Sequence, residues 1–175
     1  MKIIAFAATS SKKSVNKQLV SFAANLVDGA TVELLDINDY EMPLFSEDRE
    51  AELGKPQLAQ DFLAKIASAD AVIISFAEHN GSYTAAYKNL FDWSSRSNPK
   101  VFQGKPMVML ASSPGPGGAK TVLGAATTSA PYFDGDVKAS FSLPSFYQNF
   151  DVENAVVSNE SLLAELKNAV ALLQQ

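Results

Sequence analysis

The sequence predicts an α/β fold in which helices cover both faces of a parallel β-sheet. Apolar runs of strand length alternate with stretches in which apolar residues recur at helical spacing. The runs Lys2–Ala8 and Asp70–Phe76 are almost wholly apolar, as is typical of strands that are covered on both faces. Five strands separated by helices favour a three-layer sandwich, and we expect residues 1–175 to form one domain.

The expected strands are Lys2–Ala8, Thr31–Ile37, Asp70–Phe76, Lys105–Ser112 and Asp136–Phe141. Asp70–Phe76 is the most apolar of them and is therefore expected at the centre of the sheet. Thr31–Ile37 is less apolar than the other runs. Two further stretches, Glu41–Lys55 and 142–157, show no regular pattern and are expected to be irregular.

Helical spacing predicts five helices. The first begins at Ser14 and places five apolar residues on one face, namely Val15, Leu19, Phe22, Ala23 and Leu26. The second begins with a proline, which suits the first turn of a helix. The other four helices are expected at Pro56–Ser68, Thr84–Ser94, Gly118–Ala130 and Ser161–Leu173.

Composition and charge exclude several classes of protein. The chain has no cysteine, which excludes disulfides and thiolate metal sites, and its single histidine argues against a zinc site. A net charge of −5 argues against binding to nucleic acid or to a membrane surface. The apolar stretch at the start suits a strand better than a signal peptide. We therefore expect a cytoplasmic protein.

In open parallel sheets the ligand lies beyond the carboxyl ends of the strands, where the strand order reverses. The loops after the first, third and fourth strands are therefore the candidate site. The first loop combines hydroxyl groups, two lysines, an amide and the free N–H groups of a helix start, all of which bind phosphate. The alternative is that Ser14 only caps the helix and the lysines are solvated. The loop comprises Thr9, Ser10, Ser11, Lys12, Lys13, Ser14, Val15 and Asn16.

Two common phosphate-binding motifs are absent. No glycine occurs between Met1 and Asp28, so the first loop lacks the G-x-G-x-x-G fingerprint of dinucleotide-binding folds. The segment PGPGGAKT ends like the loop of nucleoside triphosphatases, but the two required glycines fall on Pro114 and Ala119. Hydrolysis of a nucleoside triphosphate is therefore not expected.

The loop after the third strand contains Glu78, His79, Asn80 and Gly81. Gly81 allows close approach of the backbone to a flat ligand, and Asn80 offers hydrogen-bond donors and an acceptor. The alternative is an ordinary Asn-Gly turn. The position of this loop, directly after the most apolar strand, favours a ligand-binding role.

The loop after the fourth strand is rich in glycine and proline. It offers main-chain amides and few side chains to a ring system, although it could also be a simple strand-to-helix turn. Its candidate binding residues are Ser112, Ser113, Gly115, Gly117 and Gly118.

Together the three loops resemble those of the flavodoxin-like NAD(P)H-dependent FMN reductases, a family that includes chromate, quinone and azo-dye reductases. That family has the patterns G-S-x-R-x-x-S-x-N, P-E-Y-N-G-S followed by L-K-N-A-x-D-W, and S-x-G-x-x-G-G. The corresponding segments here are TSSKKSVN, AEHNGS with YKNLFDW, and SPGPGG. The middle pair is the most specific, and the resemblance runs from about Lys2 to the terminal helix.

The resemblance implies a five-stranded sheet in the order 2-1-3-4-5 and non-covalently bound FMN. It implies that NADPH or NADH gives hydride to the flavin, which reduces an acceptor such as free flavin, a quinone, an azo dye or a metal oxyanion. The cofactor then carries the chemistry, and no side chain is required as a catalytic residue. The phosphate would lie on the first loop, and the ring between the other two loops. The expected cofactor-binding residues are Ser10, Ser11, Lys12, Ser14, Asn16, Glu78, His79, Asn80, Gly81, Ser112, Ser113, Gly115, Gly117 and Gly118.

The sequence departs from the family at two places. The family arginine falls near Ser11 or Lys12, where a lysine supplies charge but no planar bidentate fork. The family proline and tyrosine become Ala77 and His79. His79 could stack on the ring, or it could be an exposed loop residue.

Four residues of the next helix are interpreted as structural: Lys88, Asn89, Asp92 and Trp93. Lys88 and Asp92 are four residues apart and can form an ion pair on a helix. Trp93 could belong to the core or to a subunit contact. Asp36, at the end of the second strand, is interpreted as a loop cap.

Two other functions remain open at this stage. A flavodoxin-type electron carrier would bind FMN without nicotinamide, but only Glu78 and Asp92 are acidic near the loops, whereas Lys12, Lys13 and Lys88 are basic. A flavin-free α/β binding module is the third possibility, because the arginine is missing.

Six aromatic residues lie close together near the carboxyl end: Tyr132, Phe133, Phe141, Phe146, Tyr147 and Phe150. An irregular, aromatic-rich segment is typical of a subunit interface. Together with the resemblance it predicts a homodimer or homotetramer. The expected partners are nicotinamide nucleotide and a small-molecule electron acceptor.

Overall fold

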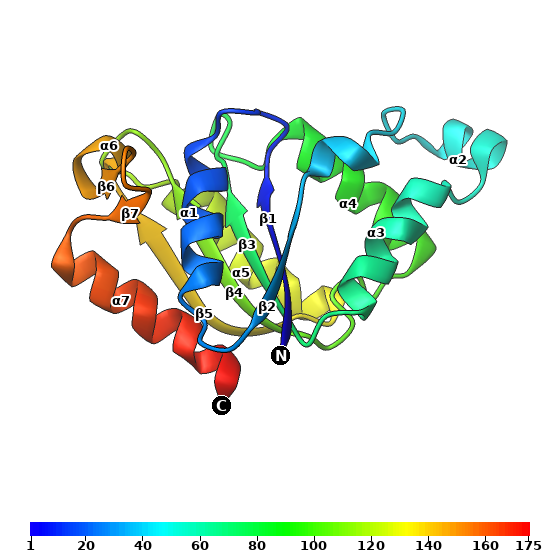
Figure 1. Ribbon diagram of the computed structural model, residues 1–175. Coiled ribbons are helices and arrows are strands. Elements are labelled where there is room, and N and C mark those ends of the chain that lie inside the picture. Colours follow the sequence, from blue (N-terminus) through cyan, green and yellow to red (C-terminus); the bar gives the residue numbers. More distant parts are fainter.

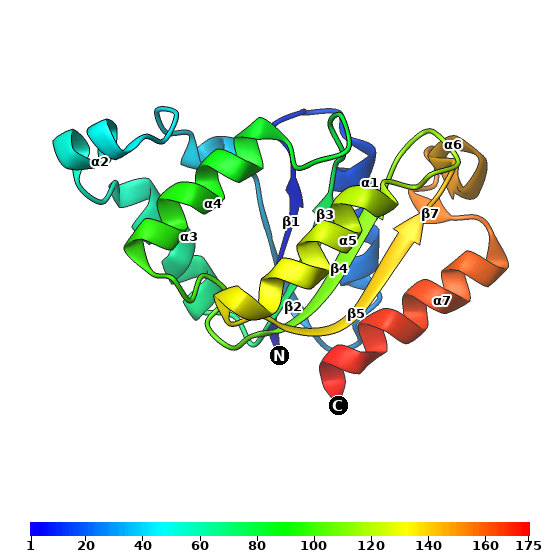
Figure 2. The ribbon, with the colours of Figure 1, turned by 180° about the vertical axis from the view of Figure 1, so that it is seen from behind.

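A computed structural model describes residues 1–175. Its main sheet has five parallel strands in the order β2-β1-β3-β4-β5, with helices on both faces (Figures 1 and 2). This confirms the predicted α/β class and the strand order. β3, predicted to be central, is the middle strand. The strands are β1 Lys2–Ala8, β2 Thr31–Leu35, β3 Ala71–Phe76, β4 Pro106–Ser112 and β5 Asp136–Leu143.

Seven α-helices accompany the sheet, together with three short 3₁₀ helices and a small hairpin. The α-helices are α1 Val15–Asn25, α2 Glu47–Leu53, α3 Gln57–Ala67, α4 Ala85–Ser97, α5 Lys120–Ser129, α6 Phe146–Asn149 and α7 Glu160–Ala171. The 3₁₀ helices are η1 Ile37–Tyr40, η2 Ala130–Phe133 and η3 Leu172–Gln174, and the hairpin pairs β6 Phe150–Asp151 with β7 Val156–Val157.

The alternation of side chains along the strands divides the core into two layers. Ile3 and Ala5 of β1 pack with α1 and α7, whereas Ile4 and Phe6 pack with α3, α4 and α5 on the other face. Because both faces are covered, every residue of β3 is buried. The near-continuous apolar runs in the sequence have this physical origin.

The two stretches expected to be irregular are partly regular. The stretch Glu41–Lys55 contains α2, a helix with no buried residue, so it has no apolar face for a sequence pattern to reveal. Its start is instead marked by Ser46, whose side chain accepts the Arg49 N–H, and by acidic residues in its first turn. The stretch 142–157 contains the end of β5, α6 and the β6–β7 hairpin.

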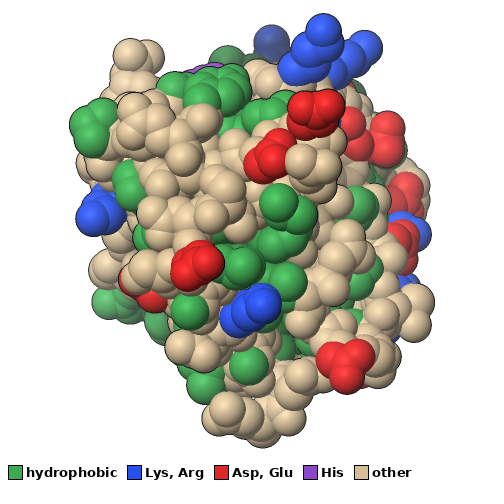
Figure 3. All heavy atoms as spheres, turned by 60° about the vertical axis from the view of Figure 1, so that its left-hand side comes forward, with side chains coloured by type: hydrophobic (Ala, Val, Ile, Leu, Met, Phe, Trp, Pro, Cys, Tyr) green, Lys and Arg blue, Asp and Glu red, His purple; other side chains and the backbone are tan.

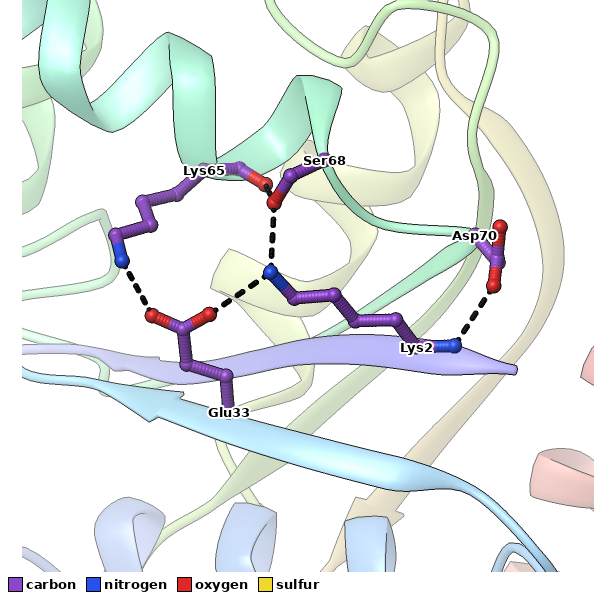
Figure 4. A network of polar contacts seen from close by, with 5 residues as sticks. All are labelled: Lys2, Glu33, Lys65, Ser68 and Asp70. Carbon is purple, nitrogen blue, oxygen red and sulfur yellow. Dashed lines mark hydrogen bonds and ion pairs between the residues drawn. The ribbon is translucent and has the colours of Figure 1, made fainter.

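An ion-pair network lies at the amino-terminal end of β1 (Figure 4). Glu33 accepts from Lys65 Nζ at 2.6 Å and lies 3.0 Å from Lys2 Nζ, which also donates to Ser68. The Lys2 main-chain N–H donates to Asp70 at 2.7 Å. The network therefore joins β1, β2 and the end of α3. The hydrogen bond from Lys65, with that from Lys2, holds the pKa of Glu33 below its ordinary value.

Acid should weaken this network. Because the pKa of Glu33 is lower in the folded protein, its stabilising effect is complete above the unfolded pKa, about 4.3, and is lost as the pH falls through the lower, folded pKa. We expect Glu33→Gln to reduce stability at pH 7 by no more than about 1 kcal/mol and to make the loss of stability below about pH 4 smaller. Urea unfolding at both pH values measures this. Glu165→Gln, an exposed residue of α7 outside any ion pair, is the control, and an unchanged acid response of Glu33→Gln would contradict the prediction.

Candidate functional site

The loops after β1, β3 and β4 all lie at the carboxyl edge of the sheet, at the top of Figure 1. β1 and β3 are neighbours whose last paired residues are Ala8 and Phe76. The chain leaves β1 toward one face of the sheet, where α1 packs, and leaves β3 toward the other, where α4 packs. The strand order thus reverses between β1 and β3, which is where α/β proteins bind their ligands.

The β1–α1 loop presents a row of free hydrogen-bond donors. The amide groups of Lys12, Lys13, Ser14 and Val15 donate to no acceptor in the protein, and they stand at the positive end of α1. Lys12 and Lys13 are exposed and form no ion pair. Figure 3 shows basic side chains gathered at the upper rim of one face. This loop suits a phosphate group.

The other predicted residues of this loop differ in their exposure. Ser10 and Ser11 are exposed, whereas Ser14 is buried and caps α1 by accepting the Asn16 N–H at 3.1 Å. Ser14 is therefore a helix cap, and its predicted contact with a phosphate stays a prediction. The cap leaves the hydroxyl proton of Ser14 available to a ligand.

Asn16, predicted to contact a phosphate, turns its side chain into the protein. Its Oδ1 accepts from Ser75 Oγ at 2.7 Å and from the Ser112 N–H at 2.9 Å, and its Nδ2 donates to the Ser112 carbonyl at 3.0 Å. The residue is only 1 % exposed. Asn16 thus joins the start of α1 to the ends of β3 and β4, and pairs with the Ser112 backbone as a neighbouring strand would.

The β3–α4 loop contains a tight turn. His79 N–H donates to the Ser82 carbonyl at 3.0 Å, and Ser82 N–H donates to the His79 carbonyl at 3.2 Å. Between them Asn80 has φ 52° and Gly81 has φ 74°, the left-handed pair that a two-residue type I′ turn requires. The segment is thus an Asn-Gly turn, which leaves His79, Asn80 and Gly81 exposed at the rim, and their binding role stays a prediction.

Glu78, predicted to lie beside the ring, forms a hydrogen bond with the neighbouring helix α5. Its Oε2 accepts the N–H of Val122, the third residue of α5, at 2.8 Å. The cap residue of α5 is Ala119, which has no side-chain oxygen, so α5 lacks a cap of its own. Glu78 supplies the missing acceptor and a negative charge at the positive end of the helix. It therefore joins the β3–α4 loop to the start of α5.

Substitutions at Glu78 should separate the contribution of its hydrogen bond from that of its negative charge. Glu78→Ala is expected to lower the free energy of unfolding by about 1 kcal/mol, because the Val122 N–H loses its acceptor. Glu78→Gln keeps a carbonyl oxygen and should cost less than about 0.5 kcal/mol. Urea unfolding of both variants measures the difference. Equal losses in the two variants would count against the capping role.

The β4–α5 loop divides into buried and open residues. Ser112 is buried and donates its hydroxyl to the Leu143 carbonyl at 2.8 Å. Gly118 is buried against Ser142 and Pro144. Ser113, Gly115 and Gly117 lie nearer the surface, and a Cβ placed on either of these glycines would meet nothing within 4 Å. The open part of this loop can therefore approach a ligand closely.

The segment from Lys88 to Trp93 on α4 is structural, as interpreted from the sequence. Lys88 and Asp92 form an ion pair at 2.7 Å. Asn89 donates to the Met42 carbonyl and accepts from the Phe45 N–H, and Trp93 donates to the Pro43 carbonyl at 2.7 Å. Trp93 is 1 % exposed and belongs to the core. The segment thus fixes the loop that precedes α2.

Asp36 also has the role interpreted from the sequence. Its carboxylate caps η1 by accepting the Asn38 N–H at 3.0 Å, and it pairs with Lys17 at 2.7 Å. Sequence reasoning missed Thr84, whose buried hydroxyl donates to the Ala8 carbonyl at 2.9 Å and joins the ends of β1 and α4. A hydroxyl residue immediately before a helical pattern was the available signal.

These residues fit a phosphate attached to a flat ring. Free amides and two lysines provide the anion site, and the Asn80-Gly81 turn and the open glycines provide backbone surfaces without bulky side chains. No helix of the structure is both long and apolar enough to span a membrane. The fold and the candidate site together define an α/β protein whose switch point suits a phosphorylated, ring-containing ligand.

Residues 1–144 match the NADPH-dependent FMN reductase family, and the chain belongs to this family. An NAD(P)H-dependent FMN reductase of Pseudomonas aeruginosa is 34% identical over 116 residues, which cover 66% of this chain and 61% of the relative. An NADPH:quinone oxidoreductase of Arabidopsis thaliana is 30% identical over 125 residues, 69% of this chain and 62% of the relative. The matched region thus spans less than two thirds of these relatives.

Solved structures share the fold. The flavoenzyme NAD(P)H:(acceptor) oxidoreductase FerB of Paracoccus denitrificans superposes with a TM-score of 0.77 at 23% identity, covering 99% of this chain and 95% of FerB. An FMN-dependent NADH-azoreductase of Bacillus anthracis, in complex with FMN, gives a TM-score of 0.65 at 13% identity, with 99% of both chains covered. At these identities the likeness supports the fold alone.

Proposed function

We propose that residues 1–175 form one FMN-binding domain, and that the protein is an NAD(P)H-dependent oxidoreductase. Its acceptor would be a small molecule such as free flavin, a quinone, an azo dye or a metal oxyanion. Family membership and the names of the relatives from Pseudomonas aeruginosa and Arabidopsis thaliana support this reading. The expected cytoplasmic location stays a prediction.

The observation that carries the proposal is the row of free amides from Lys12 to Val15 beside the exposed Asn80-Gly81 turn. The amides, with Ser10, Ser11 and the Lys12 ammonium group, would hold the FMN phosphate. The turn, with Ser113, Gly115 and Gly117, would border the ring. Asn16, Glu78, Ser112 and Gly118 would support these loops from within, because their hydrogen bonds and contacts lie inside the protein.

FMN bound here would supply the hydride-accepting and electron-donating chemistry. The protein's part is to bind and orient. The helix end and the lysines would neutralise the phosphate, and the turn would position the ring. No side chain in the three loops is required to carry a proton, and the exposed His79 is free to stack on a ring.

The test is the absorption spectrum of the purified protein before and after addition of FMN, followed by anaerobic titration with NADPH and with NADH. We expect a bound flavin spectrum that either nicotinamide bleaches. A flavin spectrum that neither nicotinamide bleaches would indicate an electron carrier. A protein that takes up no FMN would overturn the proposal.

We also propose that the protein is a homodimer or homotetramer. Four of the six clustered aromatic residues pack in the molecule, but Tyr132 is 85% and Tyr147 66% exposed, and such side chains are enriched at interfaces. Analytical ultracentrifugation at micromolar concentration tests this. A monomer at every concentration would refute it.

A further inference from the structure

A fourth segment reaches the candidate site from β5. Because the sheet is parallel, the chain that leaves β5 emerges at the same carboxyl edge as the three loops, beside the β4–α5 loop (Figures 1 and 2). This β5–α6 segment, residues 144–146, bonds to its neighbour through the main chain. The Ser145 N–H donates to the Gly115 carbonyl at 2.9 Å, and the Phe146 N–H donates to the Ser113 carbonyl at 3.1 Å.

The far end of the β4–α5 loop is held from the same side. Ser142 Oγ donates to the Gly118 carbonyl at 2.7 Å, and Gly118 lies against Pro144. The β4–α5 loop is thus bonded to the chain that follows β5 at both of its ends. The residues between these contacts stay open, since a Cβ on Gly117 would meet nothing within 4 Å.

The backbone of Ser145 is strained where it makes these contacts. Its φ of 45° and ψ of 58° lie in the left-handed region, which residues with a side chain seldom adopt. In this conformation two successive N–H groups reach carbonyls of the same neighbouring loop. Such strain persists only where the surrounding structure fixes the conformation, and it is common at functional sites.

Two side chains fix the β5–α6 segment. Phe146 is completely buried and stacks on Phe150 with ring centroids 4.6 Å apart. Asn149, the last residue of α6, donates from Nδ2 to the Pro144 carbonyl at 2.8 Å. Its Oδ1 accepts from Nδ2 of Asn159, the cap residue of α7, at 3.0 Å. One amide side chain thus bonds to the strained segment and to the start of α7 at once.

We propose that Asn149 is a positioning residue of the candidate site. Through the Pro144 carbonyl it holds the β5–α6 segment, and this segment fixes Ser113 and Gly115 where they would border the FMN ring. A loop that is already in place loses less conformational freedom when the ring binds, so loosening it weakens binding. The inference rests on the proposed function, because it concerns the same site.

The test compares Asn149→Ala with Asn154→Ala by two measurements. On protein prepared without flavin, we expect the Ser145 and Phe146 amides of Asn149→Ala to exchange with deuterium about tenfold faster, because the segment opens more often. In FMN titrations, its Kd should rise about three- to tenfold and the visible absorption band of the bound flavin should shift. Asn154 is exposed and bonds only to Asp151 within the hairpin, so Asn154→Ala should change neither measurement.

A second variant isolates the hydrogen bond to the segment. Asn149→Asp keeps an oxygen that accepts from Asn159 but loses the donor to the Pro144 carbonyl. It should therefore resemble Asn149→Ala in exchange rate, affinity and flavin spectrum. This variant keeps the test decisive if Asn149→Ala does not fold. Original behaviour in Asn149→Asp would overturn the role assigned to the bond.

The two measurements separate failure of this inference from failure of the proposed function. If the original protein and Asn149→Ala bind FMN with equal affinity and the same spectrum, Asn149 does not position the site, whatever the exchange rates. Weaker binding with unchanged exchange would also overturn the inference, because the effect would not pass through the β5–α6 segment. An original protein that binds no FMN would overturn the proposed function, while exchange would still show whether Asn149 holds the segment.

Discussion

Replacing Asn16 with alanine is expected to lower the free energy of unfolding by about 3 kcal/mol and to weaken binding at the loops. The substitution removes three buried hydrogen bonds and leaves the Ser75 hydroxyl and both backbone groups of Ser112 without their partner. Each buried polar group left unpaired costs about 1–3 kcal/mol, and water that enters the space offsets part of this. Urea unfolding and FMN titration measure the two effects.

Asn25→Ala is the matched control on the same helix. Asn25 is exposed and makes a single hydrogen bond to the Ser21 carbonyl at 2.9 Å, so its loss should cost less than about 0.5 kcal/mol. A loss of stability below about 1 kcal/mol in Asn16→Ala would show that the three hydrogen bonds do not hold the loops together.

Replacing Gly118 with alanine is expected to cost about 2–3 kcal/mol. Gly118 has φ 59°, a conformation that costs an alanine about 1 kcal/mol or more. A Cβ at this position would overlap Ser142 Oγ and lie 3.1 Å from Pro144 Cα. Ser142 would have to rotate and give up its hydrogen bond to the Gly118 carbonyl, now 2.7 Å long. The midpoint of urea unfolding should fall accordingly.

Gly117 provides the comparison one residue away. Its added Cβ would meet nothing within 4 Å, and its φ is not positive. Gly117→Ala should therefore change the free energy of unfolding by less than about 0.5 kcal/mol. If both alanine variants were equally stable, the close packing between this loop and the end of β5 would have no energetic importance.

The strands of the sheet could be predicted from the sequence because burial on both faces determines the residue types within each strand. Strands covered on both faces must be apolar along their length, and β1, β3 and β4 are nearly so. That the three loops meet at one edge could also be predicted, since parallel strands bring their carboxyl ends together there. The helix α2 could not be predicted by periodicity because it buries no residue.

The sequence could not predict which polar residues of the loops face outward and which form hydrogen bonds inside the protein. A polar residue that faces a ligand and one that faces the protein have the same local pattern. The partners of Asn16 lie 59 and 96 residues away in the chain, and that of Glu78 lies 44 residues away. Only the folded chain shows that these side chains support the site from inside.

The ion-pair network around Glu33 stands at the opposite edge of the sheet from the three loops. The acid response that Glu33 carries and the proposed ligand contacts therefore lie in different parts of the protein. Substitutions in the three loops are expected to leave this network unchanged.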